Sequence, residues 1–199
     1  MQGQHYILAS SSPQRKILLE RLGIEFEVRP IQCAEDLDRD ESAELMVERI
    51  CREKMAAALA QLPADAIAHS VIITSDTLVS LDHHRLGKPE TPAEARRFLR
   101  LLSDRTHQVL TGVCLSSPDA SPHPEVCYGC SSSDVSFIDL QDRDIAWYIA
   151  SNEWREAAGG YRIQGKAACF ISRISGSPTG IMGLPLELLY GMLSACRRP

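Results

Sequence analysis

Short apolar runs alternate along the chain with longer amphipathic segments. The apolar runs predict β-strands at residues 5–9, 26–30, 70–81, 107–117, 135–140 and 169–175. The amphipathic segments predict helices at about residues 13–22, 43–62, 92–102, 142–150 and 184–193. Strands that alternate with helices in this way indicate an α/β fold, with a mixed central sheet flanked by helices.

The segment at residues 70–81, SVIITSDTLVSL, is the most apolar of the predicted strands, and we expect it at the centre of the sheet. Residues 82–85 predict the turn of a hairpin directly after it, so the sheet should not be purely parallel. The chain has neither an internal repeat nor a stretch that looks like a linker. Residues 1–199 are therefore expected to form one domain.

The composition narrows the class of protein. The chain has 199 residues, of which 44% are hydrophobic, and a net charge of −5, which argues against a general nucleic-acid binder. Apolar runs stay well short of the ~20 residues that a membrane helix needs. The N-terminal MQGQH lacks the basic segment and apolar core of a signal peptide. We therefore expect a cytoplasmic protein that binds neither nucleic-acid polymers nor membranes.

The seven cysteines are odd in number and scattered mostly through apolar contexts, which suits reduced thiols better than a disulfide framework. Cys127 and Cys130 form the one pair with the spacing of redox and metal sites. The chain has no second C-x-x-C that would complete a zinc site. A structural role is favoured for this pair, and a thiol redox protein that uses Cys127 and Cys130 is kept as an alternative.

Three serines, residues 10–12, connect the first predicted strand to the first predicted helix. Serine is a good helix cap, and Pro13 suits the first helical position. The free N–H groups of the helix, the serine hydroxyls and the cations Arg15 and Lys16 together would cradle a phosphate group. An ordinary cap with solvated cations explains the same residues equally well. The chain contains neither a Walker sequence nor a nucleophile elbow.

Asp76 interrupts the most apolar strand of the chain. A buried lone charge is costly, so this carboxylate is expected to have a partner, a metal ion or a chemical role. We expect it at a strand end that faces a cleft, with the hydroxyl of Thr77 beside it. Lys88 follows a glycine and precedes a proline, and a lysine held in such a turn can be aimed at an anion, although GKP is also a common loop.

Three further polar residues are ambiguous from the sequence alone. Glu35 lies among acidic loop residues and Lys54 lies on a predicted helix, and each has the pattern of a solvated charge. Gln164 lies in the glycine-rich segment AAGGYRIQG, and its amide offers both a donor and an acceptor that could read the edge of a base. The alternative for this segment is a simple turn.

The motifs LASSSPQRK, SDT followed by LGKP, HQVLTGV, AGGYRIQG and GLPLELL occur in this order between Ile7 and Leu193. In their order and spacing they resemble the Maf family of nucleotide pyrophosphatases. The resemblance implies the α/β fold of inosine-triphosphate pyrophosphatases, with a cleft between two lobes. It also implies hydrolysis of nucleoside triphosphates to the monophosphate and pyrophosphate, with Mg²⁺ or Mn²⁺ as cofactor. A homodimer is compatible with the resemblance, but no feature of the sequence argues for one.

The resemblance also assigns roles to individual residues. Asp76 is implied as the catalytic acid that acts on water or metal, with Glu35 as its fellow metal ligand. The catalytic set around the triphosphate is implied to be Asp76, Glu35, Lys54 and Lys88. The implied substrate-binding residues are Ser10, Arg15, Thr77 and Gln164. Of these, Thr77 and Gln164 are similar to the branch that cleaves dTTP and UTP rather than the branch that acts on 7-methyl-GTP, which stays an alternative.

The chain departs from the family pattern after Pro13. The family has two arginines there, whereas this chain has Gln14 and Arg15. Gln14 lacks the positive charge that would pair with phosphate. Lys16 is a candidate replacement, although it projects about 100° further round the helix. A nucleotide-binding regulator of septum formation with weak or no catalysis is therefore kept as another alternative.

Overall fold

The computed structural model describes residues 4–34, 36, 40–82, 84–118 and 124–195. The strands are β1 (His5–Leu8), β2 (Phe26–Val28), β3 (Ser70–Leu81), β4 (His84–Leu86), β5 (Thr106–Ser116), β6 (Val126–Phe137) and β7 (Ile171–Ser175). The α-helices are α1 (Pro13–Glu20), α2 (Ala43–Gln61), α3 (Ala64–His69), α4 (Pro92–Leu102), α5 (Asp142–Ala150), α6 (Pro178–Ile181) and α7 (Leu186–Ala195). Two short 3₁₀ helices are η1 (Ala158–Gly160) and η2 (Lys166–Phe170).

The strands form one mixed sheet in the order β2-β1-β3-β5-β6-β7, and β4 pairs with β3. Strand β1 runs parallel to both β2 and β3, whereas the other pairs are antiparallel. The predictions of a mixed sheet flanked by helices and of a central strand at residues 70–81 are therefore confirmed.

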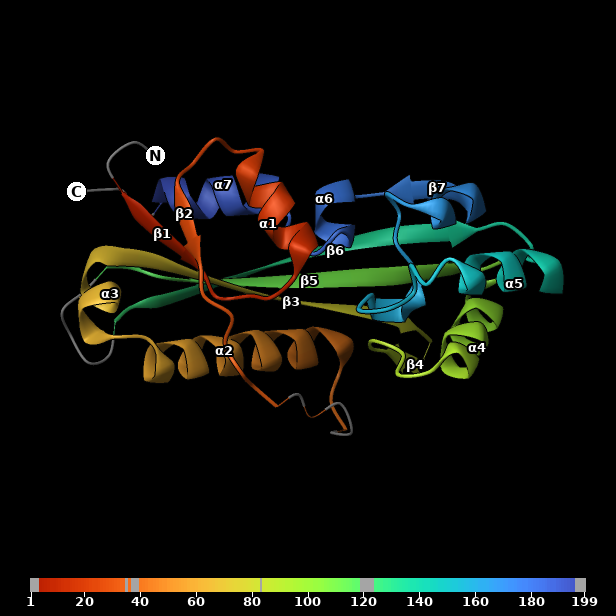
Figure 1. Ribbon diagram of the computed structural model, residues 1–199, viewed down its shortest axis with the longest axis horizontal. Helices are drawn as coiled ribbons and strands as arrows, with labels where there is room; N and C mark the ends of the chain where they lie inside the picture. The colour runs from red at the N-terminus through yellow and green to blue at the C-terminus, as the bar shows by residue number, and fades with distance from the viewer. Residues whose placement is uncertain (1–3, 35, 37–39, 83, 119–123, 196–199) are drawn as a thin grey trace.

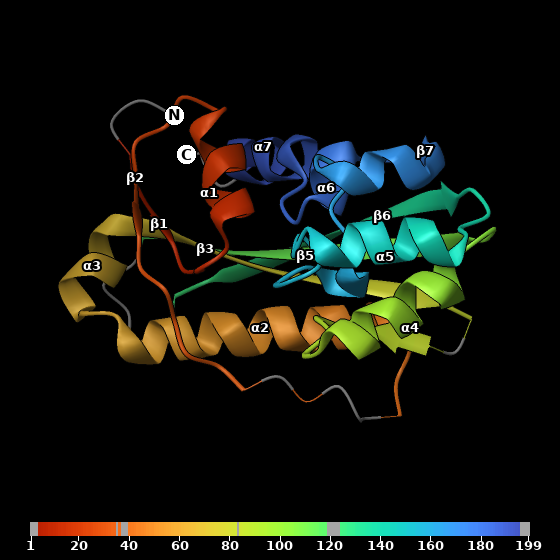
Figure 2. The same cartoon turned by 45° about the vertical axis from the view of Figure 1, so that its right-hand side comes forward.

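The long strands β3, β5 and β6 run through the whole length of the molecule (Figure 1). Helix α2 covers one face of the sheet, and α1, α6 and α7 cover the other, as Figure 2 also shows. We call the end that contains β1, β2, α1, α2, α3 and α7 the first lobe. The end that contains β4, α4, α5 and β7 is the second lobe. The predicted two-lobed architecture is confirmed, with both lobes built on the same strands.

Each lobe has its own apolar core. In the first lobe, α1 and α7 bring Leu18 and Leu189 to one face of the sheet, and α2 brings Met55 to the other face. In the second lobe, a separate cluster includes Phe98 and Trp154. Burial of these side chains fixes the helices against the shared strands.

The edge of β3 that faces β1 is open between the two lobes. Strand β1 ends at Leu8, which pairs with Ile73, and β4 begins to pair only at Val79. Asp76 lies in this gap, in the interior of β3. The expectation that Asp76 lies at a strand end is therefore wrong. The neighbouring strand ends here, and the strand that carries Asp76 continues.

Strand β6 differs most from the sequence prediction. It spans Val126–Phe137, whereas the apolar pattern predicted a strand at residues 135–140. The missed part, VCYGCSSSD, is too polar and too rich in serine to predict a strand, but it pairs with β5 along its whole length. Tertiary pairing outweighs local propensity in this segment. The short helices α3 and α6 were also not predicted.

Cys127 and Cys130 both lie on β6, and the geometry of a strand decides whether they can form a redox pair. Side chains alternate between the faces of a strand, so Cys127 and Cys130, which are three residues apart, project to opposite faces. Cys127 packs beside the apolar cluster of α7, whereas Cys130 shares the other face with Tyr128. This geometry does not fit a C-x-x-C redox pair, and the thiol redox alternative is rejected.

The described helices include none that is both long enough and apolar enough to span a membrane.

Candidate active site

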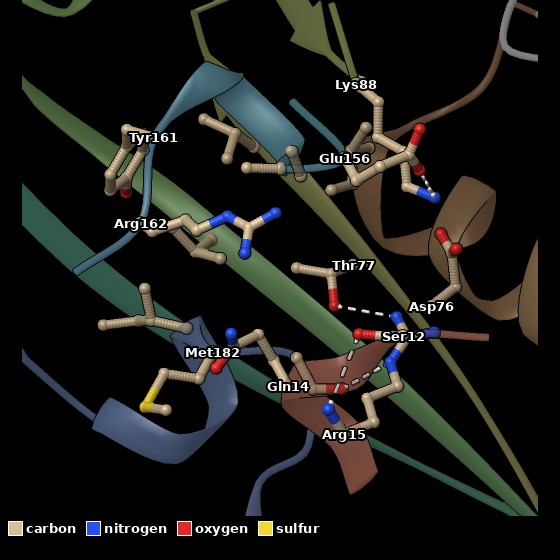
Figure 3. A pocket seen from close by; sticks show the side chains of 18 of the residues that line it. Ser12, Gln14, Arg15, Asp76, Thr77, Lys88, Glu156, Tyr161, Arg162 and Met182 are labelled. Atoms are coloured by element: carbon tan, nitrogen blue, oxygen red, sulfur yellow. Dashed lines mark hydrogen bonds and ion pairs between the residues drawn. The ribbon is translucent and has the colours of Figure 1, made fainter. Parts of the chain in front are cut away.

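A cavity of about 350 Å³ lies at the open edge of β3, between the two lobes. Its walls come from the start of α1, the middle of β3, residues 87–88, residues 156–164 and residues 181–183. Figure 3 shows side chains from both lobes converging on it. A second cavity of about 510 Å³ adjoins it and shares Ser12, Arg15, Lys54 and Lys88. Segments far apart in the sequence therefore build one site.

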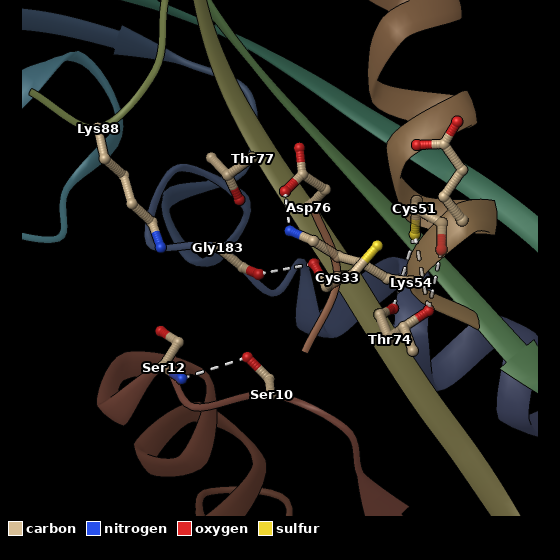
Figure 4. A network of polar contacts seen from close by, with 12 residues as sticks. Ser10, Ser12, Cys33, Cys51, Lys54, Thr74, Asp76, Thr77, Lys88 and Gly183 are labelled. Atoms are coloured by element: carbon tan, nitrogen blue, oxygen red, sulfur yellow. Dashed lines mark hydrogen bonds and ion pairs between the residues drawn. The ribbon is translucent and has the colours of Figure 1, made fainter. Parts of the chain in front are cut away.

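Asp76 and Lys54 form an ion pair at this site (Figure 4). The Lys54 Nζ lies 2.5 Å from the Asp76 Oδ1, and Asp76 is only 6% exposed. Lys54 reaches Asp76 because α2 packs on the face of β3 to which Thr74 and Asp76 project. The ammonium group compensates a carboxylate that would otherwise be costly to bury. The structure thus brings together two of the predicted catalytic residues.

The serines before α1 act both as a cap and as part of the cavity wall. The Ser12 hydroxyl caps α1 by accepting a hydrogen bond from the Arg15 backbone N–H. The Ser10 hydroxyl accepts one from the Ser12 backbone N–H at 3.2 Å. Ser11 and Ser12 line both cavities. The cap and the phosphate cradle were posed as alternatives, and the geometry accommodates both.

Arg15 connects three parts of the site. Its Nε donates to the Gly183 carbonyl at 2.9 Å, its Nη1 to the Ser10 hydroxyl at 3.2 Å and its Nη2 to the Thr77 hydroxyl at 3.3 Å. These contacts tie the start of α1 to β3 and to the loop before α7. The sequence predicted a cation at this position but not its bridging contacts, which fix the guanidinium in the cavity wall.

Thr77 and Asp76 project to opposite faces of β3, yet both line the cavity. The Thr77 hydroxyl accepts from Arg15 and from the Thr111 hydroxyl, the latter at 3.0 Å. Because β3 has an open edge here, the cavity reaches side chains from both faces of the strand.

Lys88 lies at the cavity mouth, where it pairs with Glu156. The Nζ to Oε2 distance is 3.3 Å, and the two side chains are 55% and 76% exposed. The loop that carries Lys88 is held by a hydrogen bond from the Gly159 N–H to the Gly87 carbonyl. Gly159 has a φ of 67°, and a Cβ there would lie 2.8 Å from Val79, so this close approach requires glycine.

Gln164 lines the cavity together with Tyr161 and Arg162 from the same segment, and its predicted contact with the base stays a prediction. Glu156 also lines the cavity, and Tyr161, Arg162 and Glu156 were not predicted from the sequence. For Tyr161 and Arg162 the available signal was the glycine-rich pattern AAGGYRIQG, because glycines permit tight turns and close approach to a ligand. Glu156 lies just before this segment, and no pattern in the sequence marked it.

Tyr161, which lines the cavity, contacts a buried histidine, His107. The His107 Nε2 lies 2.7 Å from the Tyr161 hydroxyl, and the imidazole stacks edge-on against the rings of Tyr161 and Phe137. Among the described residues, the His107 Nδ1 has no hydrogen-bond partner. Burial lowers the pKa of His107 to about 4, because a charged imidazole would lose its hydration.

Of the predictions for Lys16 and Glu35, the structure contradicts the first and does not describe the second. Gln14 lines the cavity, but Lys16 does not, and its Nζ pairs instead with Glu20 at 3.8 Å on the exposed side of α1. The suggestion that Lys16 replaces the missing arginine is therefore wrong.

Glu35 lies outside the described residues, so its predicted place beside Asp76 stays a prediction. In the described part of the chain, no group of three or more acidic, histidine or cysteine side chains could hold a metal ion.

Comparisons with known proteins agree with the motifs. Residues 5–196 match the family model described as Maf-like protein. A dTTP/UTP pyrophosphatase of Ralstonia nicotianae is 44% identical over 188 residues, covering 92% of this chain and 89% of that protein. A dTTP/UTP pyrophosphatase of Escherichia coli K12 is 41% identical over 187 residues, covering 94% and 90%.

A solved structure, a nucleoside-triphosphatase (dITP/XTP pyrophosphatase) from Mycobacterium abscessus, matches with a TM-score of 0.39 and 15% identity over 69% of this chain and 76% of that chain. The family match over nearly the whole chain and the high identity to the two relatives confirm the resemblance stated above. This chain belongs to the Maf-like protein family.

Proposed function

We propose that this protein hydrolyses nucleoside triphosphates, with dTTP and UTP preferred, to the monophosphate and pyrophosphate. The two pyrophosphatases to which it is similar, one from Ralstonia nicotianae and one from Escherichia coli, support the reaction and the pyrimidine preference. The observation that carries the proposal is the partly buried pair of Asp76 and Lys54 in a cavity that also holds Arg15 and Lys88. Cations around one carboxylate suit a polyphosphate substrate and a water nucleophile.

In this proposal the triphosphate lies along the serines, Lys54 and Lys88, and the base lies toward Tyr161 and Gln164. The serine hydroxyls and the N–H groups at the start of α1 donate to phosphate oxygens. Lys88 leaves its exposed pair with Glu156 and binds phosphate instead, because an exposed pair is worth little.

The donor set at the site fits Mg²⁺ or Mn²⁺. Mg²⁺ is usually held by one or two carboxylates together with substrate phosphates, and so does not need a cage of protein ligands. Asp76 is the described carboxylate that would hold it, with Glu35 as the predicted second ligand. When bound, the ion neutralises phosphate charge and makes a bound water more acidic.

Asp76 has the geometry of a group that orients the attacking water. Its Oδ1 accepts from Lys54, and its Oδ2 makes no hydrogen bond to the described residues, which leaves that oxygen for the metal ion or for a water molecule. Lys54 holds the carboxylate in place and adds positive charge near the phosphates. As the oriented water forms its bond to the α-phosphorus, the bond from the α-phosphorus to the bridging oxygen breaks and pyrophosphate leaves. Asp76 takes up the proton that the water loses, and no covalent intermediate is required.

The first test is pyrophosphate release from dTTP, UTP, CTP, ATP, GTP and 7-methyl-GTP, with Mg²⁺, with Mn²⁺ and with a chelator. We expect release from dTTP and UTP that the chelator abolishes. Release from 7-methyl-GTP alone would keep the enzyme but contradict the pyrimidine branch. Tight nucleotide binding without release from any substrate would favour the regulator of septum formation instead.

Gln14 gives a gain-of-function prediction. Because Gln14 lines the cavity at the start of α1, Gln14→Arg is expected to add a phosphate-binding charge and to raise kcat/KM for dTTP by roughly threefold to tenfold. Lys16→Gln is the matched control, because Lys16 pairs with Glu20 outside the cavity and its loss should leave the rate unchanged. An unchanged or lower kcat/KM in Gln14→Arg would show that the site does not use a cation there.

A further inference from the structure

The guanidinium of Arg162 lies in the cavity with few partners. Its Nη2 donates to the Arg155 carbonyl at 2.6 Å, and its backbone N–H donates to the Tyr148 hydroxyl at 3.2 Å. The Nε is buried and has no partner in the described part of the chain. Figure 3 shows the side chain directed into the cavity toward Thr77.

No carboxylate of the described residues forms an ion pair with Arg162. An arginine has N–H donors on all three nitrogens and no acceptor, so a half-buried guanidinium with one side-chain hydrogen bond retains unused donors. The contact with the Arg155 carbonyl fixes its orientation. A fixed donor that lines a cavity is suited to an acceptor atom of the ligand.

The position of Arg162 indicates which part of a nucleotide it meets. Lys88 and Asp76 lie on one side of the cavity in Figure 3, and Arg162 and Tyr161 lie on the other. The cations Lys54 and Lys88 belong to the phosphate side. Arg162 instead belongs to the same segment as Gln164, whose amide side chain also lines the cavity. Arg162 is therefore placed at the end of the site that would hold the base.

We propose that Arg162 determines specificity by donating a hydrogen bond to an exocyclic carbonyl oxygen of the pyrimidine base. This inference rests on the function proposed above. Uracil and thymine carry a carbonyl where cytosine carries an amino group. A guanidinium donor suits the carbonyl and faces another donor if the base is cytosine. The Gln164 amide, which offers both a donor and an acceptor, complements the rest of the base edge.

The test compares UTP with CTP in the wild-type protein and in Arg162→Ala. We expect Arg162→Ala to lower kcat/KM for UTP by about tenfold to a hundredfold, the usual range for a hydrogen bond to a charged group. The value for CTP should change by no more than about threefold, so the preference for UTP shrinks. Arg143→Ala is the matched control, because Arg143 is an exposed arginine on α5 and its loss should change neither substrate.

Equilibrium binding of UMP and CMP, without metal, provides a readout that does not depend on catalysis. Arg162→Ala should weaken UMP binding and leave CMP binding unchanged. Thermal unfolding of the variant checks that it still folds, and Arg162→Lys, which keeps the charge, should retain part of the UMP preference. This comparison stands even if the wild-type protein releases no pyrophosphate, a result that would overturn the proposed function alone.

Two outcomes would overturn the assignment of Arg162. One is an equal loss with UTP and CTP, together with weaker inhibition by inorganic tripolyphosphate, because Arg162 would then bind the phosphates. The other is an unchanged ratio of UMP to CMP affinity in a folded Arg162→Ala variant, because the base would then be read by other groups.

Discussion

Asp76→Asn is expected to lower kcat for dTTP by about a thousandfold, within the range that a positioned general base contributes. Asparagine has nearly the same shape, but its amide cannot accept a proton from water or bind a metal ion as a carboxylate does. The Lys54 ammonium loses its counter-charge in a partly buried position, so some loss of stability should accompany the loss of rate. Pyrophosphate release at saturating dTTP, with a urea unfolding curve for each variant, separates the two effects.

Asp134→Asn is the matched control for this experiment. Asp134 is an exposed carboxylate on β6, away from the cavity, and its loss should leave kcat unchanged. Lys54→Met should reproduce much of the loss seen in Asp76→Asn, because Lys54 holds the carboxylate and adds charge near the phosphates. If Asp76→Asn kept a tenth or more of the wild-type kcat, Asp76 would not be the group that orients the water.

Lowering the pH is expected to destabilise the protein through His107. Burial holds the pKa of His107 at about 4, against an ordinary value of 6.5, so between these values the unfolded chain binds a proton that the folded chain does not. Stability from this residue is fully present above pH 6.5 and falls as the pH drops toward 4. The total loss is about 3 kcal/mol, at 1.36 kcal/mol per pKa unit.

Urea unfolding at pH 7 and at pH 5, for the wild type and for His107→Gln, measures the pH-dependent contribution of His107 to the free energy of unfolding. Other titrating groups are shared by the two proteins, so the wild type should lose about 2 kcal/mol more than the variant over this interval. Equal losses in the two proteins would mean that His107 takes up its proton without unfolding. The Tyr161 hydroxyl next to Nε2 is the group that would then accommodate a charged imidazole.

The parts of the fold with a strong local pattern could be predicted from the sequence. Helices α4 and α5 begin and end at the predicted residues, because a capping residue and a clear apolar face define each of them. Strand β3 was predicted from its long apolar run. The first part of strand β6 could not be predicted, because it owes its conformation to pairing with β5 rather than to its own serine-rich composition.

In the candidate site too, residues marked by a local pattern could be predicted, whereas contacts that depend on tertiary packing could not. Asp76 could be identified because a carboxylate in an apolar strand is unusual. Its pairing with Lys54 depends on how α2 packs across the sheet, which no local pattern contains. Arg162 was missed because an isolated arginine in a glycine-rich loop looks like an ordinary solvated charge. Its significance comes from the cavity that it lines and from the donors that stay unused there.

The continuity of β3, β5 and β6 through both lobes limits how the enzyme can respond to a nucleotide. A hinge needs a few connecting residues that absorb a change in backbone angles. Here the lobes are joined by paired strands, and the hydrogen bonds between β3 and β5 extend from Ile72 to Ser80, on both sides of the cavity. Rotation of one lobe against the other would break this ladder. We therefore expect any closure over a substrate to involve the loops at the mouth, around Lys88 and Glu156, and the strands to hold Asp76 and Thr77 in place.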